Sequence, residues 1–146
     1  LERLNARKYS VAIRLNGTSD IAWEIKEPWI FSLFPLVQFY DYTKLGGRFD
    51  KILPHNYDLT FSLHEQNRTR ALELLGRGVN VAIVLEHLGD WLAHGQWAGF
   101  PILDGSADDR RWMDPKGYVV GLRPLGPARK DSSGFVLRDK PERLAA

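Results

Sequence analysis

Short segments of β-type sequence recur along the chain, and helical or turn-rich segments separate them. The four clearest are residues 11–16, 37–43, 57–62 and 79–85, in which apolar side chains alternate with polar ones or form an apolar run. Strands joined by crossover connections lie parallel in one sheet. A length of 146 residues is typical of one domain. The sequence therefore predicts a single α/β domain with a mostly parallel sheet.

The connections carry start and stop signals of their own. Residues 21–34 are apolar and tryptophan-rich, and Pro28 predicts short helical pieces there rather than one helix. A short helix is also predicted over 48–53. Residues 62–65 (Ser-Leu-His-Glu) match a capping box, which predicts that a helix begins there. The glycines within 76–78 predict its end.

The C-terminal third is less regular. Residues 100–103 and 118–122 are shorter strand candidates, and prolines and glycines after Arg123 indicate irregular chain. We predict an α/β domain over 1–137, followed by a flexible basic tail over 138–146. The sheet is expected to be partly open and to resemble half a barrel of βα repeats. Open edges favour pairing with another chain, so we expect a homo-oligomer, specifically a two-fold dimer.

Three of the predicted strands carry polar side chains on one face, which is unusual for a parallel sheet. Because charged and hydroxyl groups are rarely buried without partners, one face is expected to be solvated, joined in a polar network or covered by polar chain. The carboxyl ends of such strands form the ligand-binding rim of α/β folds. A polar pocket on this rim is one interpretation, and mutual capping of the polar residues is the other. The residues concerned are Arg14, Asn16, Asp41, Thr43, Asp58, Thr60 and Ser62.

Composition excludes several kinds of chemistry. The chain has no cysteine, which excludes disulfides, thiolate nucleophiles and cysteine-ligated metal centres. No stretch approaches the roughly 18 apolar residues of a membrane span, and nothing resembles a signal peptide. We therefore expect a cytoplasmic protein without a membrane partner. The chain begins with Leu1 rather than methionine, and we interpret it as a trimmed, processed or partial sequence.

Charge is distributed unevenly. The net charge is +2, but residues 110–146 hold nine Lys or Arg against four Asp or Glu. This basic quarter of the chain could bind nucleic acid or another polyanion. The alternative is a solvated terminus without a partner.

Residues 43–48 (Thr-Lys-Leu-Gly-Gly-Arg) join a predicted strand to a short helix. Gly46 and Gly47 could let backbone amides face an anion, while Lys44 and Arg48 supply positive charge. The glycine spacing is not that of a P-loop. The segment is thus a candidate phosphate cradle, with a flexible connection as the alternative. The complete predicted anion-binding set is Arg14, Asn16, Lys44, Arg48, Arg110 and Arg111.

Carboxylates gather in the polar loop after residue 103. Their oxygens are suitable ligands for Mg²⁺ or Ca²⁺, although an EF-hand would need glycine at Asp109 and glutamate at Pro115. Ion pairing with the neighbouring arginines around a turn is the alternative. The candidate ligands of a divalent cation are Asp104, Asp108 and Asp109, and no other cofactor is predicted. The four histidines lack metal-ligand spacing, and glycines 89 and 95 weaken a helix that would place His87 and His94 on one face.

Five tryptophans are many for this length. Trp23 and Trp29 are expected in the core. Trp91 and Trp97 lie among small and polar residues and could stack on a base or sugar or lie at an interface, with core packing as the alternative.

Several runs of sequence resemble uncharacterised phage- and plasmid-borne proteins that are grouped as domains of unknown function. These runs are residues 14–21, 39–44, 56–62, 80–84 and the stretch from 104 to 123. The resemblance implies a match over about residues 10–137, confined to the C-terminal portion of the longer relatives, without their cysteine-containing N-terminal region. It further implies an origin in a mobile element and part of a larger, barrel-like α/β unit. It implies no activity.

Three functions are compatible with these features. The first is a homodimeric binding module for a phosphate-bearing ligand, such as a nucleotide, or for nucleic acid. The second is a metal-assisted enzyme acting on a phosphorylated substrate, with Asp41, Lys44 and Asp104 as its catalytic candidates. The third is a protein-interaction domain without chemistry.

Overall fold

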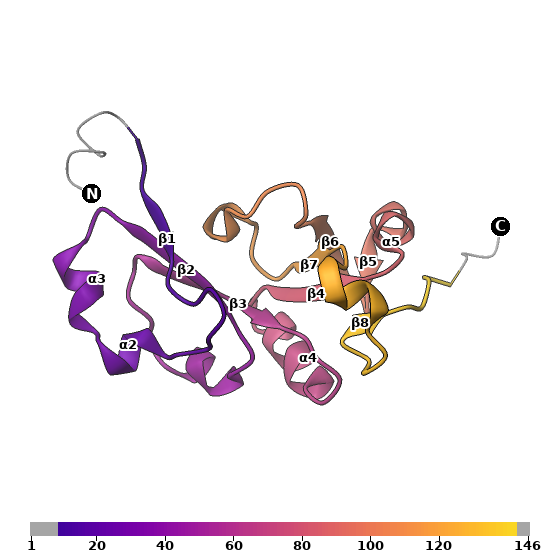
Figure 1. Ribbon diagram of the computed structural model, residues 1–146, viewed down its shortest axis with the longest axis horizontal. Coiled ribbons are helices and arrows are strands. Elements are labelled where there is room, and N and C mark those ends of the chain that lie inside the picture. The colour runs from indigo at the N-terminus through magenta and orange to yellow at the C-terminus, as the bar shows by residue number, and fades with distance from the viewer. Residues whose placement is uncertain (1–8, 143–146) are drawn as a thin grey trace.

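The structure is a computed structural model that describes residues 9–142 (Figure 1). Within this range the sheet has eight strands in the order β1-β2-β3-β4-β7-β6-β5, and β8 also pairs with β4. All pairings are parallel except the β5–β6 hairpin. The sheet does not close, so the predicted single-domain, mostly parallel and partly open α/β fold is confirmed. The strands are β1 (Ala12–Arg14), β2 (Gln38–Thr43), β3 (Tyr57–Ser62), β4 (Val81–Leu85), β5 (Gln96–Trp97), β6 (Phe100–Asp104), β7 (Val119–Leu122) and β8 (Val136–Leu137).

The helices pack mainly against one face of the sheet. They are α2 (Trp23–Lys26), α3 (Trp29–Leu33), α4 (Arg68–Gly76) and α5 (Leu88–His94). In Figure 1, α2, α3 and α4 lie below the strands, and the orange loop between β6 and β7 lies above them. Short 3₁₀ helices complete the structure at Gly46–Asp50, Arg111–Met113 and Gly126–Lys130. No helix among residues 9–142 is long and apolar enough to span a bilayer.

Side-chain alternation along the strands creates the core. In β4, Val81, Ile83 and Leu85 are fully buried on the helix face, where they join Leu74 and Leu75 of α4. Burying one side chain of this size contributes roughly 1.5–3 kcal/mol. A second apolar cluster lies between the strands β2 and β3 and the helix α3. It consists of Phe31, Val37, Phe39, Tyr57 and Leu59, with partly buried neighbours. On the opposite face, the loop between β6 and β7 crosses the sheet, and its 3₁₀ helix contacts β2 and β3.

The strand β4 has different partners along one of its edges. β3 pairs with its first half, where Ser62 is opposite Ala82, and β8 pairs with its second half, where Val136 is opposite Val84. The Leu63 N–H still donates to the Ala82 carbonyl at 2.9 Å, and the Glu86 N–H donates to the Leu137 carbonyl at 3.0 Å. β3 and β8 therefore separate at the carboxyl end of β4 and leave a hollow between them.

The predicted capping box at residues 62–65 is wrong. The helix α4 begins at Arg68, because the N–H of Leu63 is used in pairing with β4 and cannot enter a first helical turn. Asn67 closes the intervening loop instead, accepting from the His64 N–H at 2.8 Å and donating to the Ser62 carbonyl at 3.0 Å. The predicted helix end is correct, since Gly78 has a φ of 87° just beyond α4.

Other local predictions also change. The short helix predicted over 48–53 is a 3₁₀ helix at Gly46–Asp50, and residues 88–94 form α5 despite Gly89. Trp91 and Trp97 are buried, so core packing rather than exposure to a ligand or interface is correct, whereas Trp29 is 56% exposed rather than in the core. The Arg68 guanidinium carbon lies 4.5 Å from the centre of the Trp97 ring. The buried indole is therefore covered in part by a charged side chain, which is consistent with the polar residues around it in the sequence. Part of the predicted tail 138–146 lies outside the described residues, and the boundary at 137 stays a prediction.

Candidate functional site

A groove runs across the open face of the sheet at the carboxyl ends of its strands. Its main part has a volume of about 720 Å³. Two smaller hollows, of about 310 and 350 Å³, adjoin it: Arg14, Tyr42 and Ser62 line both the main part and the first, and Phe135 lines both the main part and the second. We call these three connected hollows the carboxyl-edge groove.

The floor of the groove follows from the separation of β3 and β8. Ala82 and Val84 of β4 point to the open face, opposite to the core residues Val81 and Ile83, and both line the groove. Because the side chains at these two positions are small, they leave space above the sheet for the groove. Leu122, Leu125 and Phe135 form an apolar wall, because β7 ends at Leu122 and the chain returns past the groove toward β8.

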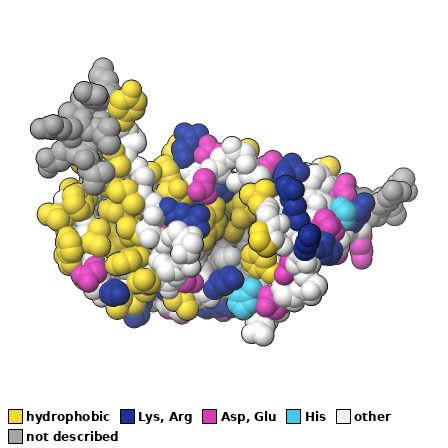
Figure 2. All heavy atoms as spheres, in the orientation of Figure 1, with side chains coloured by type: hydrophobic (Ala, Val, Ile, Leu, Met, Phe, Trp, Pro, Cys, Tyr) yellow, Lys and Arg dark blue, Asp and Glu magenta, His cyan; other side chains and the backbone are white. Residues whose placement is uncertain are grey.

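Three exposed cations line the groove. The Arg14 guanidinium lies 4.9 Å from the centre of the Tyr42 ring, and the Lys44 ammonium lies 5.1 Å from that of Phe135. Arg123 has only a long contact, 3.9 Å from its Nη2 to Asp104 Oδ2. Among residues 9–142, neither Arg14 nor Lys44 forms an ion pair with a carboxylate, and the Arg14 Nε donates to the Asn16 carbonyl at 3.1 Å. In Figure 2, basic side chains are spread over the middle and right of this view, while hydrophobic ones gather at the left.

Two tyrosines of β2 bind a carboxylate on the same face. The Tyr42 hydroxyl donates to Asp109 Oδ1 at 2.8 Å, and the Tyr40 hydroxyl donates to Asp109 Oδ2 at 3.1 Å. Burial, assisted by Asp109, raises the pKa of both hydroxyls above the ordinary value of 10.0. They therefore remain protonated donors at neutral pH. These bonds are among several contacts of the loop after β6 with the sheet, and Trp112 of this loop packs at 5.1 Å against Tyr40.

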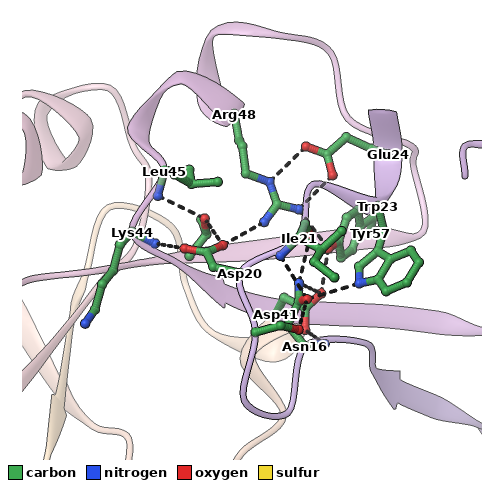
Figure 3. A network of polar contacts seen from close by, with 12 residues as sticks. Asn16, Asp20, Ile21, Trp23, Glu24, Asp41, Lys44, Leu45, Arg48 and Tyr57 are labelled. Carbon is green, nitrogen blue, oxygen red and sulfur yellow. Dashed lines mark hydrogen bonds and ion pairs between the residues drawn. The ribbon is translucent and has the colours of Figure 1, made fainter. Parts of the chain in front are cut away.

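A buried polar network occupies the helix face of the same strand ends (Figure 3). Asp41 is fully buried and accepts from the backbone N–H of Asn16 at 2.7 Å, from its side-chain amide at 3.0 Å and from the Tyr57 hydroxyl at 2.6 Å. Burial raises the pKa of Asp41, although the hydrogen bonds from Tyr57 and Asn16 oppose this shift. Asn16 in turn accepts from Ser19, Ile21 and Trp23.

Arg48 connects this network to the helices. It is 4% exposed and binds Glu24 through two hydrogen bonds, of 2.9 and 2.7 Å. It also donates to the Tyr57 hydroxyl at 2.9 Å and to Asp20 at 3.3 Å. The Asp20 carboxylate fixes the turn after β2 by accepting from Thr43 and from the Lys44 N–H. Figure 3 shows the Lys44 side chain directed away from this network.

The predicted anion-binding residues consequently separate into different environments. Arg14, Lys44 and Asn16 line the groove, but the side-chain amide of Asn16 is engaged in the buried network. Arg48 lies wholly in that network. Arg110 is exposed and forms a bidentate pair with Asp108. Arg111 is 1% exposed and lies 3.3 Å from Asp114. The residues of 43–48 thus form a turn fixed by Asp20 and Arg48, in which Thr43 and Lys44 line the groove and Lys44 is its one exposed cation there.

The catalytic and metal candidates are also apart. Asp41 is enclosed on the helix face, Lys44 faces the groove, and Asp104 accepts from the Ser106 N–H at 2.9 Å. Asp108 binds Arg110, and Asp109 binds the two tyrosines. No group of three potential metal-ligating side chains occurs among residues 9–142. A divalent cation at these carboxylates stays a prediction.

Sequence reasoning missed several groove residues. Arg123 follows directly after a predicted strand, so the rule that selected Arg14 would have selected it too. Tyr42 could have been found from the alternation of β2, because it lies on the face opposite to Asp41. Phe135 carried no local signal, since its position depends on the pairing of the two-residue strand β8 with β4.

Comparison with known proteins gives one family match. A family model described as "Gene product 88" matches residues 1–139. The match covers nearly the whole chain and includes the first residues, which the sequence resemblance, with its match over about 10–137, left out. That longer relatives carry a further N-terminal region stays a prediction. No curated protein and no solved structure matches the chain.

Proposed function

The chain belongs to the Gene product 88 family, a phage-type family whose description names no activity, and we propose that it is a binding module for a phosphate-bearing ligand, in particular a nucleotide or single-stranded nucleic acid. The observation that carries the proposal is the pair Arg14 and Lys44. Both are exposed at one groove, both lie beside an aromatic ring, and neither is paired with a carboxylate of the described residues.

The charges favour phosphate over a neutral ligand. An arginine or lysine already paired with a carboxylate gains little from a phosphate, because the new contact replaces an existing one. Arg14 and Lys44 have no such partner to lose, and Arg123 has only its long contact with Asp104. Guanidinium and ammonium groups are the usual partners of phosphate oxygens.

The apolar wall supports a ligand that also carries a base. The main part of the groove, at about 720 Å³, is within the usual size range of small-molecule sites. Its lining combines the Phe135 and Tyr42 rings with Leu125 and the floor residues Ala82 and Val84. Aromatic rings bind bases of any sequence by stacking, which is typical of proteins that bind single strands.

Fluorescence anisotropy with a labelled oligothymidylate of about ten nucleotides tests the proposal across a salt series. Binding should weaken as salt rises. The double variant R14A/K44A should lower affinity by about tenfold or more and reduce the slope of log K against log salt by about 1.4, because each lost phosphate contact removes about 0.7. ATP and inorganic phosphate as competitors distinguish a nucleotide site from a site that needs a strand.

The matched control is K26A/K51A, which removes the same charge from exposed lysines on the helix side of the molecule. It should leave binding nearly unchanged. Absence of binding by the wild type, binding that ignores salt, or an equal loss in the control would each contradict the proposal.

We also propose that the protein acts as a homodimer. The strand β1 is an edge of the sheet, and exposed edges pair readily with another chain. Exposed apolar side chains of the neighbouring helices and turns, Ile25, Trp29, Leu33 and Leu36, enlarge the surface available for contact. Light scattering at micromolar concentration should give twice the mass of the chain, and a monomeric mass would refute the dimer.

A further inference from the structure

Asp109 places a carboxylate inside the groove, beside its cations. It lines the main part of the groove together with Arg14, Tyr42 and Arg123. Its two oxygens accept from Tyr42 at 2.8 Å and from Tyr40 at 3.1 Å. Because these tyrosines are alternate residues of β2, the sheet itself fixes the spacing of the two hydroxyl donors. Two donors at fixed spacing match the two oxygens of a carboxylate and equally match two oxygens of a phosphate.

The surroundings of this carboxylate are rich in donors. Arg14 lies over the Tyr42 ring at 4.9 Å. On the inner side, Arg111 is 1% exposed, and its Nε and Nη1 donate to no acceptor of the described residues, although Nη1 lies 3.3 Å from Asp114. Both arginines act electrostatically on the Tyr42 hydroxyl. A negative group at the Asp109 position is therefore favoured whichever molecule supplies it.

We infer that the Tyr40 and Tyr42 hydroxyls, together with Arg14, form an anion subsite of the groove, and that the Asp109 carboxylate competes for it with a phosphate of the ligand. This inference rests on the proposed function and adds a subsite and its regulation. The ligand group is a phosphate monoester or diester that accepts from both hydroxyls. Binding then displaces Asp109 into solvent, toward which its residue is already exposed.

The loop can release Asp109 without detaching from the sheet. Lys116 pairs with Asp58 of β3 at 2.6 Å, and Ser106 Oγ accepts from the Arg123 N–H at 2.9 Å. Trp112 packs on Tyr40, and Arg111 is bound to the carbonyl of Asp108. These contacts anchor the loop on either side of Asp109. A purely structural role for the Asp109 contact would therefore be largely redundant.

The experiment compares the oligothymidylate affinity of the wild type with that of D109N, D108N and D109N/Y42F. D109N removes the competing charge and should bind about tenfold more tightly, within the range usual for coupled binding events. D108N removes the same charge from the adjacent residue and should show a much smaller change. Y42F keeps the ring under Arg14 but removes one donor, so D109N/Y42F should lose most of the gain.

The outcomes separate the inference from the proposed function. A gain confined to D109N and abolished by Y42F supports the subsite. If the wild type binds in a salt-dependent way but D109N binds no more tightly than D108N, or more weakly than the wild type, the subsite is refuted and the groove is not. If neither the wild type nor D109N binds, the proposed function fails. Thermal melts of all variants show whether a loss reflects unfolding, and the Y42F single variant tests the donor in a fully native background.

Discussion

Replacing Arg48 by methionine should destabilise the protein strongly. The substitution leaves Glu24, whose side chain is 6% exposed, buried without its cation, and it removes the donor to the Tyr57 hydroxyl. Removing one partner of a buried ion pair costs about 3–5 kcal/mol, since the remaining charge is not compensated. This is a large part of the roughly 5–15 kcal/mol that stabilises a typical domain. The melting temperature should fall by roughly 10 °C.

Urea unfolding followed by tryptophan fluorescence measures this loss as a lower midpoint with an unchanged slope. The matched control is R70M, because Arg70 also binds two carboxylates, Asp50 and Glu73, but at the exposed surface. Its loss should be far smaller, as is usual for surface pairs. The double variant R48M/E24Q should be less destabilised than the sum of its single changes, because the second substitution removes the charge that the first leaves unpaired.

Two results would refute this reasoning. One is a loss in R48M no greater than that in R70M, which would mean that the pair is solvated. The other is strict additivity of R48M and E24Q, which would mean that the two side chains do not interact. Folded R48M should also keep most of its oligothymidylate binding, because Asp20 still holds the turn of Lys44 through Thr43 and the Lys44 N–H. A selective loss of binding would instead support the phosphate cradle predicted over residues 43–48.

Two further predictions concern packing and pH. G121A should destabilise by about 1–3 kcal/mol in urea unfolding, because an added Cβ would lie 2.4 Å from Leu88 Cδ1 and 3.2 Å from Ile102 Cδ1. Burial raises the pKa of Asp41 above 3.8 in the folded state. Between pH 3.8 and this raised pKa, the folded state therefore binds more protons than the unfolded state. The contribution of Asp41 to stability falls as the pH rises through this range. The wild type should therefore lose stability relative to D41N as the pH rises from 3.8, measured by urea midpoints in a series from about pH 3 to 6.

The fold was predictable where local sequence and tertiary structure agree. Residues 57–62 alternate clearly and form β3 with the predicted bounds, and the glycine that follows α4 ends it as expected. The start of α4 was not predictable from its capping signal, because pairing with β4 uses the Leu63 N–H. β8 has two residues, and its existence depends on a partner far away in the sequence. No local pattern specifies such a strand.

The candidate site was predictable in part for a similar reason. Arg14 and Lys44 were selected because they follow strand ends, and the structure places both at the groove. Arg48 was selected by the same proximity, but its guanidinium turns inward to Glu24. Charge and position along the chain could not distinguish the groove residues Arg14 and Lys44 from the buried Arg48. The difference depends on a carboxylate 24 residues away in sequence, which only the packing of α2 brings near.

Within β2, the alternation of side chains between the two faces distinguishes structural residues from groove residues, which proximity to a strand end does not. Asp41 and Thr43 are buried and organise the network of Asn16 and Asp20, whereas Tyr40 and Tyr42 lie on the open face and bind Asp109. Neighbouring residues of β2 therefore point to opposite faces of the sheet, and one has a structural role while the next lies on the face of the groove. The carboxylate that faces the groove at this level is Asp109, supplied by the loop over the sheet rather than by β2. The open face is therefore covered in part by a loop that turns two carboxylates toward the sheet, Asp114 beside the buried Arg111 and Asp109 on the two tyrosines. Only Asp109 lines the groove, and this is why the competition with a phosphate is proposed for Asp109.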